Sequence, residues 1–402
     1  MEHDATIGER IAHYRRRRGL TQEVCANLVG RSESWLSQVE RGVIQMDSAV
    51  ALLNLATVLK VELAKLLGPA IDLPPNGGDH HDLPRGVPAV SRAIVYPDRF
   101  ARTTLGGPVD LDDLAARVER ARRAWWAGRY TQLAAVVPDL ILATRIATQD
   151  RPDSARAWEL LSHCCHLAET LLGQVGEDKL AWIAAERAVA AAERSGDEVL
   201  MGLGAWSLGW ALWADGHPDA ADVVIQDSAS LLESGLDEAS PQRVGLFGEL
   251  RNTTAALVAM KGDVGACREA MRDAARVAHL LPDGYVDPWT AFCPARVAFE
   301  DIRTWVEVGD PVEALRVADR TDFDALPVPE RQARAWIHVA RAHGLRRKDG
   351  PAAASLLEAE RIAPEEVRYY RWARELVGVL LRRERKSATP GLRGLARRIG
   401  VE

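Results

Sequence analysis

Apolar residues recur every three or four positions from residue 111 to residue 362, with only short interruptions. This spacing places them on one face of an α-helix, and no segment shows the apolar–polar alternation of a half-buried strand. We therefore predict an all-α fold. The predicted helices of this region span 111–127, 130–149, 153–173, 177–194, 198–215, 218–234, 241–261, 264–280, 289–308, 311–320, 330–345 and 351–362, followed by a capping helix at 364–385.

Turn glycines separate these helices at nearly regular intervals. Their separations are 48, 40, 46 and 47 residues, which indicates a helical repeat. Three of the turns, DGHPDAA, KGDVGACREA and VGDPVEAL, place an alanine four or five residues after the glycine, where a small side chain lets two helices pack closely. We expect six helix pairs stacked into a superhelix, with a concave groove that binds a peptide or small molecule. The turn glycines are Gly128, Gly176, Gly216, Gly262 and Gly309.

Residues 1–67 carry a different pattern, of shorter helices. The segment 21–42, TQEVCANLVGRSESWLSQVERG, predicts two short helices joined by a tight turn. Thr21 and Ser32 can begin these helices, because a hydroxyl at the N-cap accepts a bond from a free backbone N–H. Gly30 can end the first one, because glycine enters the left-handed region at little cost. Helices predicted at 7–18, 47–59 and 62–67 complete a five-helix domain.

Two helices joined in this way form a helix-turn-helix, in which the second helix enters the major groove of DNA. Short polar side chains on its outer face can reach base edges. The candidates on this face are Glu33, Ser34, Ser37 and Gln38, and Arg31, Ser32 and Arg41 flank them at the helix ends.

The segment resembles the helix-turn-helix of the Cro/C1-type, or XRE, family. The resemblance covers about the first sixty-seven residues and rests on RRGLTQ, a glycine eight residues after the glutamine, LSQVERG, and a helix ending LATVLKV. It implies that Gln22 binds a phosphate, that bases are read from the second helix, and that Arg15 and Glu40 form a buried ion pair. Cys25 replaces a usual leucine, and VIQM at 43–46 replaces a segment that is often basic, which predicts fewer phosphate contacts.

Composition and charge narrow the class of protein. A chain of 402 residues predicts two or more domains, and we expect a linker at 68–110, rich in proline and glycine, and a basic tail at 386–402. The net charge is −6, while residues 1–67 carry nine Lys or Arg against eight Asp or Glu. A nearly neutral DNA-binding domain depends on a few placed contacts and on dimerisation, so we expect a homodimer on a palindromic double-stranded operator.

The same composition predicts a cytoplasmic protein. No apolar run approaches the length that spans a bilayer, and the N-terminus lacks an apolar signal core. Five cysteines form no disulfide framework. Helical spacing leaves no finger-like ligand pairs in the sequence HCCH at 163–166, so we predict core packing and no metal. We find no phosphate-binding loop, no GxSxG and no isolated carboxylate pair, and predict no catalytic residue and no cofactor.

The presumed inner helices offer two candidate groups for an effector site. The first group, Trp206, Trp210 and Trp213, is spaced as one helical stripe; such a stripe is more often core, and otherwise forms an apolar wall of the groove. In the second, Asn252 beside Arg251 can both donate to and accept from a ligand amide, or can serve helix packing. Trp289 is a weaker candidate for the same groove.

The helical region resembles tetratricopeptide repeats (TPR), with a longer period. A Cro/C1-type domain joined to a TPR-like superhelix is similar to quorum-sensing regulators that bind short peptides and to regulators of secondary metabolism in actinobacteria. The resemblance implies a bacterial transcription regulator, not an enzyme, whose TPR-like domain dimerises and senses a peptide or small molecule. The alternative is a protein-interaction scaffold that recruits a partner protein, with DNA binding secondary.

Overall fold

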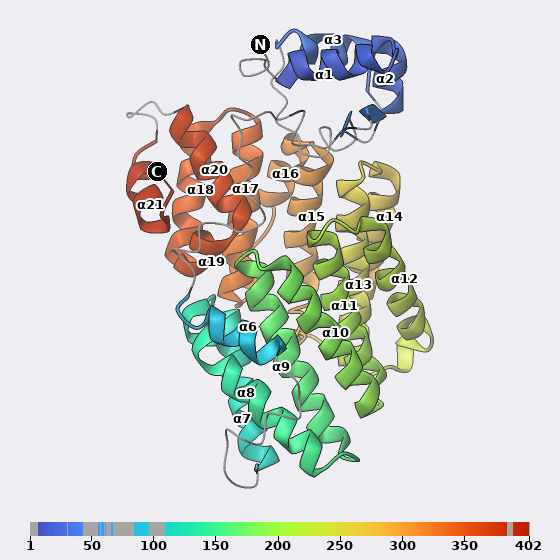
Figure 1. Cartoon of the computed structure of the whole chain (residues 1–402), viewed down its shortest axis with the longest axis vertical. Helices are drawn as coiled ribbons and strands as arrows, with labels where there is room; N and C mark the ends of the chain where they lie inside the picture. The colour runs from blue at the N-terminus through green and yellow to red at the C-terminus, as the bar shows by residue number, and fades with distance from the viewer. Residues whose placement is uncertain are drawn as a thin grey trace. The chain divides into compact units, whose positions relative to one another are not determined.

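The computed structural model describes residues 7–29, 31–42, 84–95, 109–383 and 389–401, together with 55–56, 58–59, 61 and 66. The fold is all-α, as predicted, and no strand occurs in these ranges (Figure 1). None of the helices described is long and apolar enough to cross a membrane. The chain divides into two compact units, Met1–Asp79 and His80–Glu402.

The N-terminal unit contains α1 (Ile7–Arg17), α2 (Gln22–Leu28) and α3 (Glu33–Glu40). The Thr21 hydroxyl accepts a hydrogen bond from the Val24 backbone N–H at 3.1 Å, and the Ser32 hydroxyl accepts one from the Trp35 backbone N–H at 3.2 Å. Both predicted N-caps are therefore present. Gly30 and most of the predicted fourth and fifth helices lie outside the described residues. The buried side chains that hold α1 to α3 together are Ile11, Cys25, Ala26, Leu36, Val39, Leu55, Ala56, Leu59 and Leu66.

The C-terminal unit consists of helical hairpins. Each helix packs on the next in sequence, and α7, α9, α11, α13, α15 and α17, the first helices of their pairs, also pack on one another as an inner layer. Their bounds are α7 (Leu111–Trp126), α8 (Tyr130–Asp150), α9 (Ala155–Gln174), α10 (Asp178–Ser195), α11 (Glu198–Ala214), α12 (Pro218–Glu233), α13 (Pro241–Met260), α14 (Val264–Ala278), α15 (Pro294–Val308), α16 (Pro311–Ala318), α17 (Pro329–Leu345) and α18 (Asp349–Ile362), with short 3₁₀ turns at Leu236–Glu238 and Phe323–Ala325.

The five turn glycines of the repeat all adopt a left-handed backbone, with φ between +65° and +88°. An added Cβ would be strained there whatever space surrounds it. Five of the six predicted hairpin turns are therefore set locally, by a glycine that can turn the chain at the helix end, whereas Arg347 takes the left-handed backbone in the turn between α17 and α18.

Four segments differ from the predicted boundaries. The interval 68–110 contains α6 (Val87–Val95), and the tail 386–402 contains α21 (Leu392–Ile399). The predicted helix 289–308 begins only at Pro294, because the residue before a proline is driven to extended backbone. The predicted helix 364–385 is broken at Tyr370 into α19 (Pro364–Tyr369) and α20 (Arg371–Arg382).

Burial explains why α6 and α21 form. Val87, Val90 and Ile94 lie on one face of α6 and pack into the core formed with α7 to α10. The apolar face of α21 packs in the same way against α18 to α20, through Leu392, Leu395 and Ile399. Both helices are short, so their apolar faces must find tertiary partners to be stable.

The two ends of the C-terminal unit contact each other. The Tyr130 hydroxyl of α8 donates to Glu366 Oε2 of α19 at 2.5 Å, and the Thr131 backbone N–H donates to Glu365 Oε2 at 2.7 Å. In addition, α17 packs on α7. The superhelix therefore closes on itself, and the side chains of its inner layer are buried where an open groove was expected.

A substitution on α13 should test this packing. A Cβ added at Gly248 would lie 2.1 Å from two ring carbons of the buried Phe292. We expect Gly248→Ala to destabilise the C-terminal unit, because overpacking of about 1–3 kcal/mol exceeds the gain of up to about 1 kcal/mol from replacing a helical glycine. Gly265→Ala on α14 is the matched control, since its Cβ would meet only Asp263 Oδ1 at 3.4 Å. Urea unfolding should give opposite signs for the two variants, and equal signs would contradict the close contact.

Candidate functional sites

A buried ion pair holds the two helices of the N-terminal turn to α1. Arg15 Nε donates to Glu40 Oε1 at 2.5 Å and Arg15 Nη2 donates to Glu40 Oε2 at 2.8 Å. Gln22 Nε2 donates to the same Oε2 at 2.7 Å. Burial raises the pKa of Glu40, but the hydrogen bonds from Arg15 and Gln22 outweigh it and the pKa is lowered. The expected ion pair is present. Its Glu40 carboxylate also holds the side chain of Gln22, the expected phosphate contact, at the start of α2.

The outer face of α3 carries the predicted base-reading side chains. Glu33 and Ser34 are exposed, while Ser37 and Gln38 are half-buried. Gln38 Nε2 donates to Ser34 Oγ at 3.2 Å, so these two side chains lie one turn apart on one face. At the C-terminal end, exposed Arg41 donates from Nε to the Ser37 carbonyl at 3.2 Å. The structure thus brings most of the candidate DNA-binding residues together on one helix.

A surface pocket of about 390 Å³ opens at the start of α3, lined by Asn27, Arg31, Ser32 and Trp35. The Arg31 guanidinium lies 5.6 Å from the centre of the Trp35 ring. Ser32, expected to contact DNA, uses its hydroxyl as the N-cap. Trp35 was not predicted from the sequence, where the available signal was an aromatic residue next to Ser34 in a polar helix. In the structure its side chain is half-buried.

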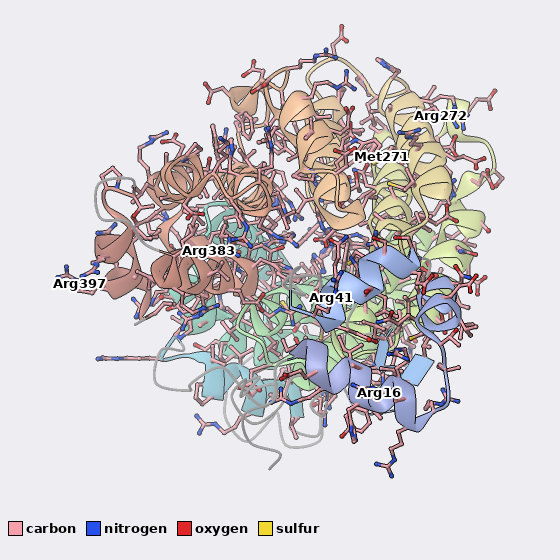
Figure 2. The ribbon with its side chains drawn as sticks, turned by 90° about the horizontal axis from the view of Figure 1, so that it is seen from above. Arg16, Arg41, Met271, Arg272, Arg383 and Arg397 are labelled. Atoms are coloured by element: carbon pink, nitrogen blue, oxygen red, sulfur yellow. The ribbon has the colours of Figure 1, made fainter. Side chains whose placement is uncertain are left out.

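Cations for phosphate contacts lie on α1. In the basic run 15–18, Arg15 is committed to Glu40, and Arg18 donates to the Val58 carbonyl. Arg16 and Arg17 are exposed, and Figure 2 shows Arg16 projecting from this unit. Two of the four arginines are thus available to a phosphate backbone.

Residues 6–66 match the family model of a helix-turn-helix domain. The N-terminal unit is a helix-turn-helix domain. Such a domain indicates a DNA-binding regulator, and a helical repeat-like region follows it. A comparison with curated proteins yields no match.

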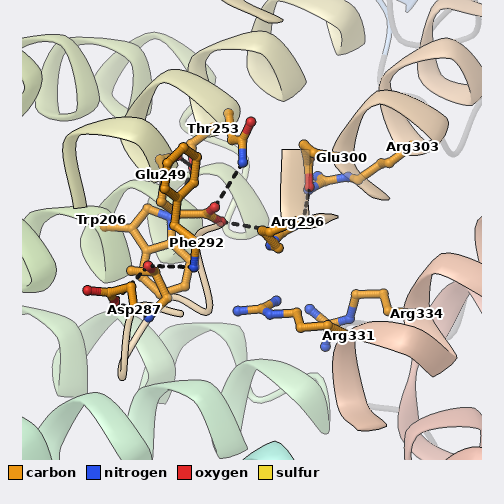
Figure 3. A network of polar contacts seen from close by, with 12 residues as sticks. Trp206, Glu249, Thr253, Asp287, Phe292, Arg296, Glu300, Arg303, Arg331 and Arg334 are labelled. Atoms are coloured by element: carbon orange, nitrogen blue, oxygen red, sulfur yellow. Dashed lines mark hydrogen bonds and ion pairs between the residues drawn. The ribbon is translucent and has the colours of Figure 1, made fainter. Parts of the chain in front are cut away.

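The inner layer of the C-terminal unit contains a chain of buried polar contacts (Figure 3). Asn252 Nδ2 donates to Glu249 Oε2 at 3.0 Å, and Arg296 Nη2 donates to Glu249 Oε1 at 2.8 Å. Arg296 Nη1 in turn donates to Glu300 Oε2 at 2.8 Å, and Arg303 Nη1 donates to Glu300 Oε1 at 2.9 Å. We call these residues of α13 and α15 the inner-layer network.

The two carboxylates bound by Arg296 respond differently to burial. Burial raises the pKa of Glu249, although Arg296 opposes the shift. Burial acts on Glu300 in the same direction, but the charges of Arg303 and Arg296 outweigh it and lower the pKa of Glu300. The difference follows from the number of cations, because Glu300 accepts from two arginines and Glu249 from one.

Some of the predicted effector residues lie in this inner layer, and others lie outside it. Trp206 is core, 6% exposed, and its Nε1 donates to Thr253 Oγ1 at 2.9 Å. Asn252 is fully buried in the network. Trp210 and Trp213 are half-buried 6.3 Å apart, and the Arg303 guanidinium lies 4.5 Å from the Trp210 ring. These residues belong to the inner layer or its border.

Two candidates lie elsewhere than expected. Arg251 Nη2 donates to Asp273 Oδ2 of α14 at 2.7 Å, so this side chain faces the second helix of its own hairpin. Trp289 lies in the connection before α15, not on a helix, and stacks on His163 with ring centres 4.0 Å apart. The sequence missed the arginines and glutamates of α15 and α17; their spacing of three and four residues on presumed inner helices was the available signal.

The HCCH sequence belongs to the core of α9. Cys164 and Cys165 are buried, and burial lowers the pKa of both His163 and His166 to about 3. His166 Nδ1 lies 2.5 Å from Ser207 Oγ. Over the described ranges, no group of three or more His, Cys, Asp or Glu side chains is arranged to hold a metal ion.

Proposed function

We propose that this chain is a bacterial, cytoplasmic transcription regulator that binds a palindromic operator as a homodimer and whose TPR-like unit senses an effector. The observation that carries the DNA-binding part is the outer face of α3, where Ser34 and Gln38 stand together on a helix capped and anchored by its own domain. Serine and glutamine side chains can form hydrogen bonds with base edges in the major groove. Exposed Arg16, Arg17 and Arg41 supply phosphate contacts.

The effector part is supported by the inner layer. Its buried polar side chains exceed what helix packing needs, since a hydrophobic replacement of buried ion pairs is often neutral or stabilising. A dimer places two recognition helices about one DNA turn, roughly 34 Å, apart. An effector, a peptide or another small molecule, changes operator affinity only if it prefers one arrangement of the hairpins over another.

Base reading is tested by substitutions on α3. We expect Gln38→Ala and Ser34→Ala each to weaken operator binding about tenfold or more, since a good side-chain contact to a base contributes about 1–3 kcal/mol of discrimination. Binding to random DNA should change little, because phosphates dominate it. The measurement is a selection of genomic fragments by the purified protein, followed by titration of the recovered sequence.

The control is Ser230→Ala, an exposed serine of α12 that bonds only its own helix backbone. It should leave fragment selection unchanged. Enrichment without a shared palindrome, or a palindrome that both α3 variants still select, would contradict sequence-specific regulation and favour a protein-interaction scaffold.

A further inference from the structure

Arg331, near the start of α17, is a buried cation that shares its nearest carboxylate with a second arginine. Its side chain is 7% exposed, and its Nε lies 3.2 Å from Oε2 of Glu330, the preceding residue. Glu330 is already shared with Arg334, whose Nη2 lies 2.7 Å from Oε1. Arg334 has Glu366 as a second carboxylate, at 3.0 Å. Within the described part of the chain, Glu330 is the only carboxylate within ion-pair distance of Arg331, and the charge of Glu249 acts on it from farther away.

Other cations surround the same guanidinium. Burial lowers the pKa of Arg331, and the charges of Arg296 and Arg334 add to this, whereas the charges of Glu330 and Glu249 oppose it. Arginine nevertheless stays protonated in proteins. The site therefore holds a desolvated positive charge that a bound anion would stabilise. Figure 3 shows Arg331 and Arg334 reaching from α17 toward the side of the inner layer that carries Arg296 and Trp206.

Several polar atoms around Arg331 lack hydrogen-bond partners. Among the residues described, Arg296 Nε and Trp125 Nε1 are buried donors without an acceptor, and Asn252 Oδ1 and both carboxylate oxygens of Glu330 are buried acceptors without a hydrogen-bond donor. The Arg331 guanidinium lies 5.8 Å from the Trp125 ring. Buried polar groups are rarely left unpaired, so each such atom calls for a partner. The two unpaired donors, with the Arg331 guanidinium near them, suit an oxyanion, while the unpaired oxygens of Asn252 and Glu330 suit an N–H or O–H.

Aromatic rings stand next to this polar set. The ring centre of His166 lies 5.3 Å from Trp125, 5.8 Å from Trp206 and 5.6 Å from Trp289. Indole rings provide flat apolar surface against which a planar or apolar body can pack. The ligand chemistry is therefore an anion at one end and an apolar or aromatic body at the other, as in a small organic acid.

We propose that Arg331 anchors the carboxylate of a small organic acid inside the C-terminal unit, with Trp125, Trp206 and Trp289 against its apolar body. This inference rests on the proposed function, because it names the class of effector that the unit senses. An acid bound here joins α17 to α7 and α11, and so favours the closed arrangement of the superhelix over any opened one.

The first test needs no ligand. Arg331→Met removes a buried cation but leaves Glu330 paired with Arg334, so we expect the melting temperature of the ligand-free protein to fall less than in Arg296→Met, which removes the arginine bound by both Glu249 and Glu300. Arg361→Met, which removes an exposed arginine of α18, is the control and should leave the melting temperature unchanged. A fall as large as that of Arg296→Met would overturn the proposal, because Arg331 would then act chiefly as a structural counter-ion of Glu330.

The second test uses defined probes with the full-length protein: phenylacetate, benzoate and N-acetyltryptophan, each beside its primary amide. We expect at least one acid to raise the melting temperature of the wild type by about 2–4 °C, its amide to have no effect, and Arg331→Met to abolish the shift. Equal shifts with acid and amide, shifts that survive in Arg331→Met, or no shift with any acid would each overturn the carboxylate site.

Operator binding shows whether the acid site or the proposed regulator function is wrong. If the acids fail while Gln38→Ala still loses a palindrome that the wild type selects, the regulator proposal stands and the acid site is wrong. If an acid binds through Arg331 and no palindrome is selected, the site stands and the regulator proposal is wrong.

Discussion

Replacing Arg296 with methionine will lower the free energy of unfolding of the C-terminal unit by about 3–5 kcal/mol, because it removes the shared partner of two buried carboxylates. Glu249 is 1% exposed and Glu300 is 2% exposed. Burial lowers the pKa of Arg296, but the charges of Glu249 and Glu300 overcome it and raise the pKa. Without Arg296, Asn252 remains the one hydrogen-bond donor to the Glu249 side chain among the described residues, and the ionised carboxylate loses the cation that acts on it most strongly.

The measurement is urea unfolding followed by tryptophan fluorescence, which reports this unit because Trp35 is the only one of twelve tryptophans before residue 80. Arg276→Met is the control. Its side chain is 74% exposed, so its ion pair with Asp273 contributes at most about 1 kcal/mol. A loss for Arg296→Met no larger than that of Arg276→Met would show that the inner-layer network does not hold the hairpins together.

Glu40→Ala will destabilise the N-terminal unit by about 2–4 kcal/mol and weaken DNA binding with it. The substitution leaves the Arg15 guanidinium, whose side chain is 11% exposed, without its carboxylate, and removes the acceptor of Gln22. A domain of this size buries little apolar surface, so a loss of this size is a large part of its stability. Hydrogen exchange of peptides from 7–42 in the full-length protein measures the effect locally.

Gln22→Ala is the matched control, because it removes one hydrogen bond and leaves the Arg15–Glu40 pair intact. We expect a loss of about 1 kcal/mol in stability. Protection of 7–42 that is unchanged in Glu40→Ala, or lost equally in both variants, would mean that the ion pair does not anchor the turn.

The helices of the repeat could be predicted because their determinants are local. Apolar residues at helical spacing and glycines that turn the chain specify each hairpin without reference to distant residues. Most predicted boundaries in this region therefore lie within one or two residues of the observed ones. The same holds for the N-terminal turn, where the hydroxyls of Thr21 and Ser32 cap helices through neighbouring backbone groups.

The candidate sites were predictable only in part. Ser34 and Gln38 could be placed on one exposed face because they are four residues apart on a helix whose apolar side is clear. Each inner helix carries apolar residues, or charged residues, on both of its faces. The spacing of apolar residues therefore does not show which face is buried. Arg251 and Asn252 illustrate this, since adjacent side chains on α13 face α14 and the inner layer respectively.

The sequence by itself determined an all-α chain, a helix-turn-helix near its start and the succession of hairpins, since periodicity, caps and turn glycines act within a few residues. Only the tertiary structure decided that the superhelix closes, because the Tyr130–Glu366 bond joins residues 236 positions apart. It likewise decided that Arg296 and Arg331 lie at the centre of a buried polar layer. Contacts of that range depend on the summed geometry of many hairpins, which no local pattern encodes.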